Sequence, residues 1–443
     1  MFQTIKNAWQ ISELRNRIMF TVFIIVLYRF GSQIPVPYIS ADALGEWFAQ
    51  QGDTIFGYLN ILSGNAFSQA TLFALSISPY ITASIVIQLL TIAIPALERL
   101  QKEEGDEGKK KLNQITRYVT IALGLITGYG YYMVCKGMGI VTYPNNAFVM
   151  VVILACYSAG SALIMWLGEK INENGIGNGI SIILFANIIS SLPGYVTQKI
   201  ASVFNVTGGQ FKIQPLNLIE PLIVLAICLV LVWVVVFMTN AERRIPIQYA
   251  KRVVGRKMYG GQSTHLPMKV NMSGVMPIIF ANSMAMLPIT IISFINSNPE
   301  PGTLLDGLRN FFGTSGFFFP VLSFILIIAF SFFYVSISFN PIEVSNNLKK
   351  NGGFIPGIRP GRPTSDYLTK ILNKLTLIGG IFLALVAVFP FVVNAIGKLA
   401  GLSSISTLAF GGSSLLIVVG VALETTREIE AQMTMRHYKG FLE

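Results

Sequence analysis

The apolar residues of this chain fall into ten long runs that are separated by polar loops. Runs of this length match helices that cross a hydrocarbon core of about 30 Å. The pattern predicts an all-α membrane protein with ten transmembrane helices. The runs cover about residues 18–34, 66–97, 117–136, 147–167, 176–192, 217–239, 272–295, 317–339, 371–394 and 405–423.

The second run is too long for one ordinary span. Residues 54–97 carry no charge, and as one helix they would extend for about 66 Å, twice the hydrocarbon core. Pro79 breaks the run, because proline lacks a backbone donor and moves its predecessor out of the helical region. We expect a short helix over Phe67 to Leu75 and a full span over Tyr80 to Leu97. A short helix at membrane depth needs protein or a water-filled cavity around it, so this segment predicts the floor of a pore or binding cavity.

The chain divides into two halves of five spans, residues 1–216 and 217–424, followed by a tail at 425–443. The second span of each half has an early proline, Pro79 and Pro277. Interrupted helices at corresponding positions indicate a central path between two pseudo-symmetric halves. An unrelated kink in either helix would give the same pattern.

Charge and composition set the orientation. Hydrophobic residues make up 53% of the chain and charged residues 12%. The N-terminus, the tail and the loops 98–117, 168–175, 240–271 and 340–374 hold 26 of the 32 Lys and Arg residues. The positive-inside rule therefore places both termini and these loops in the cytoplasm. The six basic residues on the opposite side are Arg29, Lys136, Lys199, Lys212, Arg309 and Lys398.

Two of the cytoplasmic loops are long enough to have structure of their own. Loop 240–271 alternates strand-like over Ile245 to Tyr249 and again over Val253 to Tyr259, which predicts a projecting hairpin. Glycines and prolines over Gly352 to Gly361 in loop 340–374 indicate turns. Basic protrusions suit ribosomal RNA or an acidic protein surface. The alternative is that these charges serve topology alone.

The sequence contains no recognisable motif for catalysis or for nucleotide binding. Gly105 to Lys110 lacks the spacing of a P-loop, and the glycines of 175–179 follow a helix instead of a strand. With only His265 and His437, no zinc motif can be assembled. Charges are nearly absent from the spans, and Arg29 and Glu424 lie near span ends where they can extend to the surface. We predict no enzyme activity, cofactor or metal.

Eight short motifs, in order along the whole chain, identify a resemblance to the SecY family, the pore subunits of the bacterial protein translocase. The motifs are Phe67–Ile81, Met165–Gly168, Gly175–Ser181, Gln262–Asn271, Phe339–Pro341, Asn346–Lys350, Gly357–Gly361 and Phe410–Gly412.

The resemblance implies an hourglass channel between the halves, closed by a plug half-helix at about residues 64–73. The plug residues would include Gly64, Asn65, Phe67, Ser68, Leu72 and Phe73. A ring of aliphatic side chains would form the waist, with leucine at one position where isoleucine is common. The ring residues would be Ile77, Ile81, Ile180, Leu184, Ile279 and Ile417. Such a constriction disfavours water and ions when empty. Any one of them could instead be an ordinary core residue.

The resemblance also implies a lateral gate between the second and seventh spans, through which signal peptides leave into lipid. The gate residues would be Thr82, Ser84, Gln88, Asn282, Ser283 and Leu287. Ordinary hydrogen bonding between helices is the alternative role for these polar residues. The basic contacts for the ribosome or the motor ATPase SecA would be Arg243, Arg244, Lys251, Arg252, Arg256, Lys257 and Arg359.

The remaining expectations concern partners and location. SecE and SecG would be the membrane partners in the bacterial cell membrane, and unfolded polypeptides would be the cargo. A secondary transporter with broken helices is the alternative function, disfavoured by the scarcity of charge in the spans.

Overall fold

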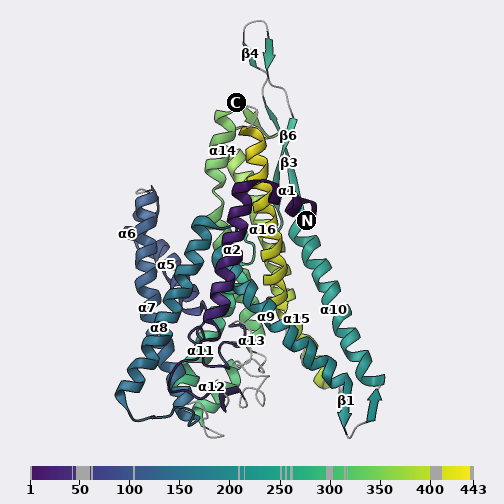
Figure 1. The fold of residues 1–443 in the computed structure, drawn as a ribbon. Helices are drawn as coiled ribbons and strands as arrows, with labels where there is room; N and C mark the ends of the chain where they lie inside the picture. Colours follow the sequence, from purple (N-terminus) through teal and green to yellow (C-terminus); the bar gives the residue numbers. More distant parts are fainter. Residues whose placement is uncertain are drawn as a thin grey trace.

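The computed structural model is built almost entirely from helices that run along one axis (Figure 1). It describes residues 2–41, 43–45, 60, 63–102, 105–207, 210–213, 215–249, 252–254, 257–259, 263–295, 303–313, 316, 318–399 and 412–439. Ten described helices of 16 or more residues coincide with the ten predicted runs. They are α2 (Ser12–Gly31), α5 (Ser78–Ala93), α7 (Gly105–Gly137), α8 (Ala147–Asn174), α9 (Gly179–Val203), α10 (Pro215–Asn240), α11 (Met276–Ile295), α13 (Phe318–Ser338), α15 (Arg362–Leu399) and α16 (Gly412–Lys439).

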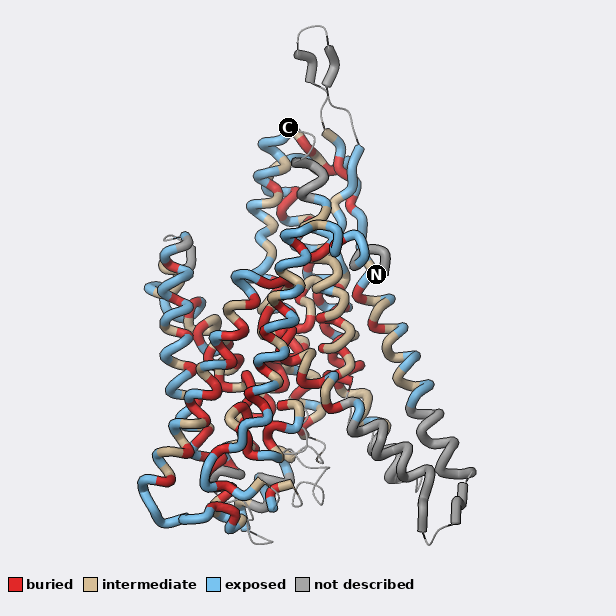
Figure 2. The backbone as a smooth tube through the Cα atoms, in the orientation of Figure 1, coloured by how far each residue is buried: buried red, intermediate tan, exposed pale blue. Residues whose placement is uncertain are grey.

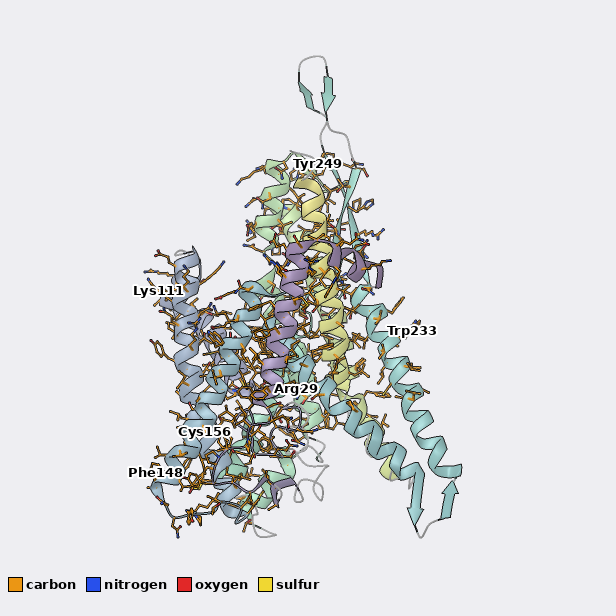
Figure 3. The ribbon with its side chains drawn as sticks, in the orientation of Figure 1. Arg29, Lys111, Phe148, Cys156, Trp233 and Tyr249 are labelled. Carbon is orange, nitrogen blue, oxygen red and sulfur yellow. The ribbon has the colours of Figure 1, made fainter. Side chains whose placement is uncertain are left out.

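Several of these helices have the length and composition of membrane spans. Four in the described part of the chain pass both criteria: Glu107–Gly137, Ala147–Asn174, Phe318–Lys350 and Arg362–Val393. Four shorter apolar helices, within α5, α9, α10 and α11, accompany them. Large apolar side chains also face outward, among them Trp233, which is 68% exposed, and Phe148 (Figure 3). An apolar exterior of this kind suits lipid.

The long helices form two bundles. In the first, α7 and α8 pack on each other, α5 packs on α7, and α2 and α9 pack on α8. In the second, α13 lies between α11 and α15, while α16 contacts α15 and α10. The bundles meet where α11 contacts α5 and α7, and again where α16 contacts α9. Buried residues concentrate between them (Figure 2). The predicted tail at 425–443 begins inside α16, which continues unbroken to Lys439.

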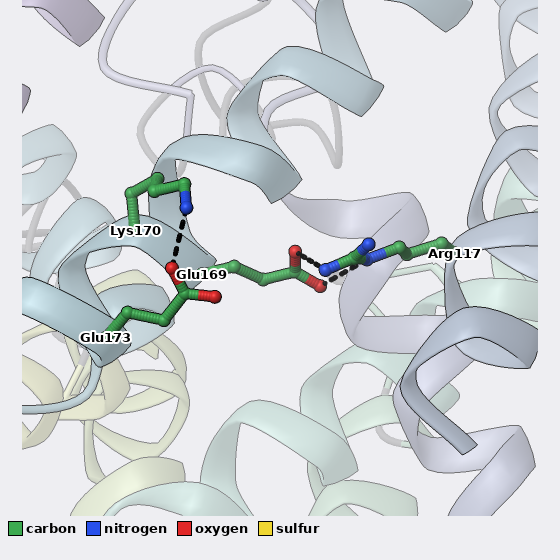
Figure 4. A network of polar contacts seen from close by, with 4 residues as sticks. All are labelled: Arg117, Glu169, Lys170 and Glu173. Carbon is green, nitrogen blue, oxygen red and sulfur yellow. Dashed lines mark hydrogen bonds and ion pairs between the residues drawn. The ribbon is translucent and has the colours of Figure 1, made fainter. Parts of the chain in front are cut away.

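Figure 4 shows the ion pair that links α7 to α8. Arg117 of α7 donates to both carboxylate oxygens of Glu169 in α8, at 3.0 and 2.6 Å. Lys170, the next residue of α8, pairs with Glu173 at 2.6 Å. A bidentate arginine–carboxylate pair fixes geometry as well as distance.

Prolines mark the beginnings of helices at equivalent places in the two bundles. The predicted break at Pro79 is confirmed, because α5 begins at Ser78 and Pro79 is its second residue. Pro277 has the same position in α11. Proline is tolerated there because the first amides of a helix have no intrahelical partner. The predicted span to Leu97 is wrong in one respect, since α5 stops at Ala93 and α6 (Pro95–Lys102) follows an extended Ile94.

The predicted short helix before Pro79 is also wrong, and residues 63–77 form consecutive turns instead. Backbone φ is positive at Gly64, Asn65, Ala70 and Ser76, which no helix tolerates. The cause is pairing with a distant segment. The amide of Leu72 donates to the carbonyl of Ile34 at 2.8 Å, and Val36 donates to Ala70 at 3.0 Å. These bonds take groups that a helix would use internally.

The predicted hairpin in loop 240–271 is confirmed, with a different second strand. Strand β3 (Glu242–Tyr249) pairs antiparallel with β6 (Ser263–Lys269). The run over 253–259 contributes instead to a separate pair near the tip, β4 (Arg252–Val254) with β5 (Lys257–Tyr259). A further antiparallel pair joins α9 to α10, β1 (Phe204–Thr207) with β2 (Gln210–Ile213).

Loop 340–374 joins the same sheet. Its strand β7 (Gly353–Phe354) pairs with β3, so the order is β6-β3-β7. Helix α14 (Pro341–Lys350) precedes β7, and its N-cap is Asn340, whose side chain accepts from the amides of Ile342 and Glu343. The sheet, α14, the N-terminal helix α1 (Phe2–Gln10) and the end of α16 all lie at one end of the molecule (Figure 1). We call this the loop end. Helix α12 (Leu304–Phe312) lies at the opposite end.

Candidate functional site

The six predicted ring residues come together in one apolar cluster between the bundles. Ile77 and Ile81 lie at the start of α5, and the others come from α9, α11 and α16. Five of the six are at most 5% exposed, and Ile180 is partly buried against them. Residues separated by up to 340 positions therefore share one contact region. The six ring residues are all aliphatic, and aromatic side chains such as Phe73 and Phe280 pack in the same cluster.

The chemistry of this cluster is that of a dry barrier. Aliphatic side chains offer no hydrogen bonds to water or ions, so a closed constriction made of them stays unwetted. They also offer no specific contacts to a passing polypeptide, and their flexible packing lets them separate around one. The structure brings the six side chains into one cluster. A ring around a pore, and a pore-lining role for each residue, stay predictions.

The predicted plug residues lie against this cluster and a second one. Phe73 is buried in the same cluster as the ring and stacks on Tyr28 of α2, with 5.3 Å between ring centroids. Phe67 is buried in a second cluster beside Tyr131 of α7, at 4.5 Å. Leu72 packs partly buried against the ring cluster. Gly64 and Ser68 are partly buried, whereas Asn65 is exposed.

Hydrogen bonds from α7 and α9 hold this segment, which we call the plug segment (residues 63–77). The Tyr131 hydroxyl of α7 donates to the Phe67 carbonyl at 2.6 Å. The Asn187 amide of α9 donates to the Ser76 hydroxyl at 3.3 Å. The sequence analysis missed both residues, since a tyrosine or asparagine inside a predicted span gives no signal of its partner.

Gly160 of α8 makes a close backbone approach possible. A Cβ at this position would overlap the Leu72 carbonyl, so any larger residue would displace the plug segment. Glycine inside a helix reduces helical stability, and a close approach of this kind is the compensating reason for it.

Arg29 corrects an expectation. It does not extend to the surface from the end of α2; it is half-buried and donates to the carbonyls of Ala186 and Gly64, at 2.9 and 3.4 Å (Figure 3). The available signal was its position, because a cation inside a span faces the protein interior or a water-filled cavity and bonds there.

The predicted gate residues lie on two helices that contact each other, α5 and α11. The Thr82 hydroxyl donates to the Ser78 carbonyl, Gln88 donates to Ser84, and the Ser283 hydroxyl donates to the Ile279 carbonyl. Each of these bonds stays within its own helix. Leu287 is partly buried, and Asn282 is 9% exposed. The gate itself stays a prediction.

The predicted basic contacts lie at the loop end. Arg243 and Arg244 are exposed on β3, where Arg244 pairs with Glu242 at 2.7 Å. Arg252 and Lys257 lie on β4 and β5; their side chains are outside the described part of the structure, as are Lys251 and Arg256 entirely.

Arg359 is exposed in a turn that two hydroxyls brace. Thr364 donates to the Arg359 carbonyl at 2.8 Å, and Ser345 donates to the Gly361 carbonyl at 2.7 Å. Gly357 and Gly361 have positive φ, which explains the glycines of this motif. The turn is therefore a rigid platform that presents one cation.

At the base of the hairpin, burial lowers the pKa of Lys269, and nearby Arg427 lowers it further, while Glu424 and Glu242 raise it. Among the described residues, no group of three or more His, Cys, Asp or Glu side chains could hold a metal ion.

Comparison with known proteins assigns the family. Residues 71–426 match the model of the family described as SecY. The chain belongs to the SecY family. It is 43% identical to the protein translocase subunit SecY of Streptomyces coelicolor and 42% identical to that of Bacillus subtilis, with 100% of both chains covered in each comparison.

Solved structures show the same fold at low sequence identity. A structure described as a protein conducting channel matches with a TM-score of 0.66 and 16% identity, over 95% of this chain and 92% of the other. Canine Sec61 in a ribosome–channel complex matches with a TM-score of 0.59 and 15% identity, over the same shares. The two-bundle arrangement is thus that of the SecY and Sec61 channels.

Proposed function

We propose that this SecY-family chain is a passive protein-conducting channel that passes unfolded polypeptides across a membrane. The observation that supports this most directly is the apolar cluster to which both bundles contribute, with the plug segment packed against it. A closed apolar constriction of this kind blocks the passage of ions at rest, and its side chains can move apart around an extended polypeptide. The family consists of translocase subunits and not of enzymes.

The driving force in this account comes from other proteins. The sequence lacks a nucleotide-binding loop, so an external motor such as SecA, or the elongating ribosome, would push the polypeptide. The exposed cations of β3 and of the Arg359 turn support docking at the loop end. We place the loop end and both termini in the cytoplasm of a bacterial cell, on the basis of the positive-inside rule. SecE and SecG would be the membrane partners.

The sideways exit would run between α5 and α11. The side chains of Thr82, Gln88 and Ser283 bond within their own helices, so separating the two helices breaks none of these three bonds. A signal peptide or an apolar segment could enter lipid there while the remainder of the chain crosses the waist.

Reconstitution distinguishes this function from transport of small solutes. Vesicles that contain the chain, the membrane partners and the motor should protect an unfolded secretory precursor from added protease, in a reaction that requires the motor's ATP. Saturable uptake of a small solute by the chain alone, without precursor protection, would support a secondary transporter and reject the proposal.

Charge reversal at the exposed turn tests the docking face. Arg359→Glu should reduce motor-driven translocation roughly tenfold, because a like charge would meet the partner's acidic surface. The protein should remain folded and inserted, since the side chain is exposed and the turn is braced by backbone acceptors. The matched control is Lys370→Glu, which reverses the charge of an exposed residue of α15. This variant should translocate normally. Normal translocation by Arg359→Glu would reject a docking role for this turn.

A further inference from the structure

Arg29 is a cation in an unusual place. It lies two residues before the end of α2, half-buried between α9 and the plug segment (Figure 3). Within the described parts of the chain, no carboxylate lies at ion-pair distance from it. Its guanidinium donates to two backbone carbonyls instead. A neutral residue would be easier to bury here than a cation that, among the described residues, donates to two carbonyls, which indicates a role beyond stability.

The two carbonyls belong to segments that must separate if the plug segment moves. One belongs to Ala186 in the middle of α9, at 2.9 Å from the Arg29 guanidinium. The other belongs to Gly64, near the start of the plug segment, at 3.4 Å. Arginine suits this position because its planar guanidinium directs several N–H donors outward in fixed directions.

The plug segment is adapted to this contact at Gly64. Its φ is +65°, a conformation that residues with a side chain rarely adopt. A Cβ there would also lie 3.0 Å from both terminal nitrogens of Arg29 and 2.9 Å from the Ser190 hydroxyl oxygen of α9. Glycine therefore lets the backbone pass directly over the guanidinium and brings it within reach of α9.

We propose that Arg29 is a positioning residue that fastens the plug segment to α9 in the resting channel and releases it when the interior becomes wet. This inference rests on the proposed channel function and deepens it. Among the described residues, the acceptors of the guanidinium N–H groups are these two carbonyls. In a dry interior the bonds are strong because no water competes. Once a polypeptide opens the waist, water solvates the cation and the bond to Gly64 loses its advantage over hydration.

The first test removes the cation. Arg29→Leu should raise the ion conductance of the resting channel in planar bilayers roughly tenfold, as expected for loss of a charge-assisted hydrogen bond. Arg29→Lys, which keeps the charge with a compact head group, should give a smaller increase. The matched control is Arg427→Leu, because Arg427 of α16 also donates to a carbonyl of a neighbouring helix, that of Thr239, away from the plug segment. Its resting conductance should equal that of the unaltered channel.

The second test perturbs the same contact from the plug side. Gly64→Ala keeps the arginine but inserts a methyl group between it and the backbone, and it should raise resting conductance in the same direction. If Arg29→Leu fails to insert into the membrane, Gly64→Ala still tests the contact. Unchanged conductance in Gly64→Ala would then overturn the proposal.

A disulfide between the plug segment and α9 tests whether Arg29 acts by positioning the plug segment or through general packing. Gly64→Cys and Ser190→Cys, in a chain whose three native cysteines are replaced by alanine, place two thiols where a Cβ approaches Ser190. Oxidation of this pair in the Arg29→Leu background should return the conductance to the resting level, and reduction should raise it again. Conductance that stays high after complete oxidation would show that Arg29 acts through overall packing, which overturns the proposal.

Deletion of residues 65–72 distinguishes failure of this inference from failure of the channel account. If the deletion leaks and Arg29→Leu does not, the plug segment seals the pore without help from Arg29, and only the inference is wrong. If neither leaks, the sealing role of the segment fails as well.

Discussion

The plug segment and the α5–α11 contact border the same apolar cluster, but they are held in opposite ways. The plug segment receives hydrogen bonds from α2, α7 and α9, through Arg29, Tyr131 and Asn187. At the α5–α11 contact, by contrast, the hydroxyls of Thr82 and Ser283 donate within their own helices. One region is tied by specific polar bonds across elements, and in the other these two hydroxyls add no bond between the helices.

This difference indicates how the channel could open in two directions, across the membrane by movement of the plug segment and sideways by separation of α5 from α11. Moving the plug segment breaks polar bonds one at a time, and each broken bond must be replaced by water or left unsatisfied. Parting α5 from α11 leaves their internal bonds intact, so lipid can replace the lost packing. We therefore expect changes at the plug segment to alter ion leakage, and restraints at the α5–α11 contact to alter passage and exit of the polypeptide.

The largest effect should come from fastening the two helices to each other. Thr82→Cys with Leu287→Cys, in a chain without its native cysteines, should lose translocation by more than about tenfold on oxidation, because a covalent bond cannot be displaced by lipid or cargo. The measurement is protease protection of a precursor in reconstituted vesicles. Reduction should restore activity, and each single-cysteine chain should be insensitive to oxidant. Continued translocation by the fully crosslinked channel would contradict the gate assignment at these positions.

A smaller effect should follow removal of one tie to the plug segment. Tyr131→Phe keeps the ring that packs on Phe67 but leaves the Phe67 carbonyl without its hydroxyl donor. Loss of about 1 kcal/mol should raise resting conductance roughly fivefold. Tyr132→Phe is the matched control, because the Tyr132 hydroxyl donates to the Pro144 carbonyl, away from the plug segment. Equal conductance of the two variants would argue that the Tyr131 bond does not restrain the plug segment.

The smallest effect should come from a hydroxyl at the α5–α11 contact. Ser283→Ala removes a group that bonds only the Ile279 carbonyl of the same helix. Resting conductance and precursor translocation should both change by less than about twofold, since a helix carbonyl keeps its backbone partner when the serine is lost. A change as large as that of Tyr131→Phe would show that this contact is also held by polar bonds, and would remove the contrast.

The features that sequence alone predicted well depend on local patterns. The ten apolar runs follow from length and hydropathy, and the start of α5 follows from Pro79. The hairpin strand at 242–249 follows from alternation between Ile245 and Tyr249. The ring required the family resemblance, because Ile279 or Ile417 alone is indistinguishable from any other aliphatic residue in a membrane helix.

What could not be predicted depends on partners far apart in the chain. The sequence predicted a short helix over Phe67 to Leu75, but residues 63–77 form turns, because Leu72 and Ala70 pair with Ile34 and Val36. Strand β3 took its partner from 263–269 and not from the nearer run at 253–259. Arg29 was assigned to the surface by its distance from the end of a span, and its two carbonyl partners lie 35 and 157 residues away.

The resting ion conductance of the channel that lacks residues 65–72 tests the central claim most directly. The account predicts a conductance well above that of the unaltered channel, because the apolar cluster would lose the partly buried Leu72 that packs on it, and the second cluster would lose the buried Phe67. The increase should occur without motor, ribosome or precursor. A conductance equal to that of the unaltered channel, in protein shown to be inserted and able to bind its membrane partners, would contradict the claim that this segment closes an apolar waist.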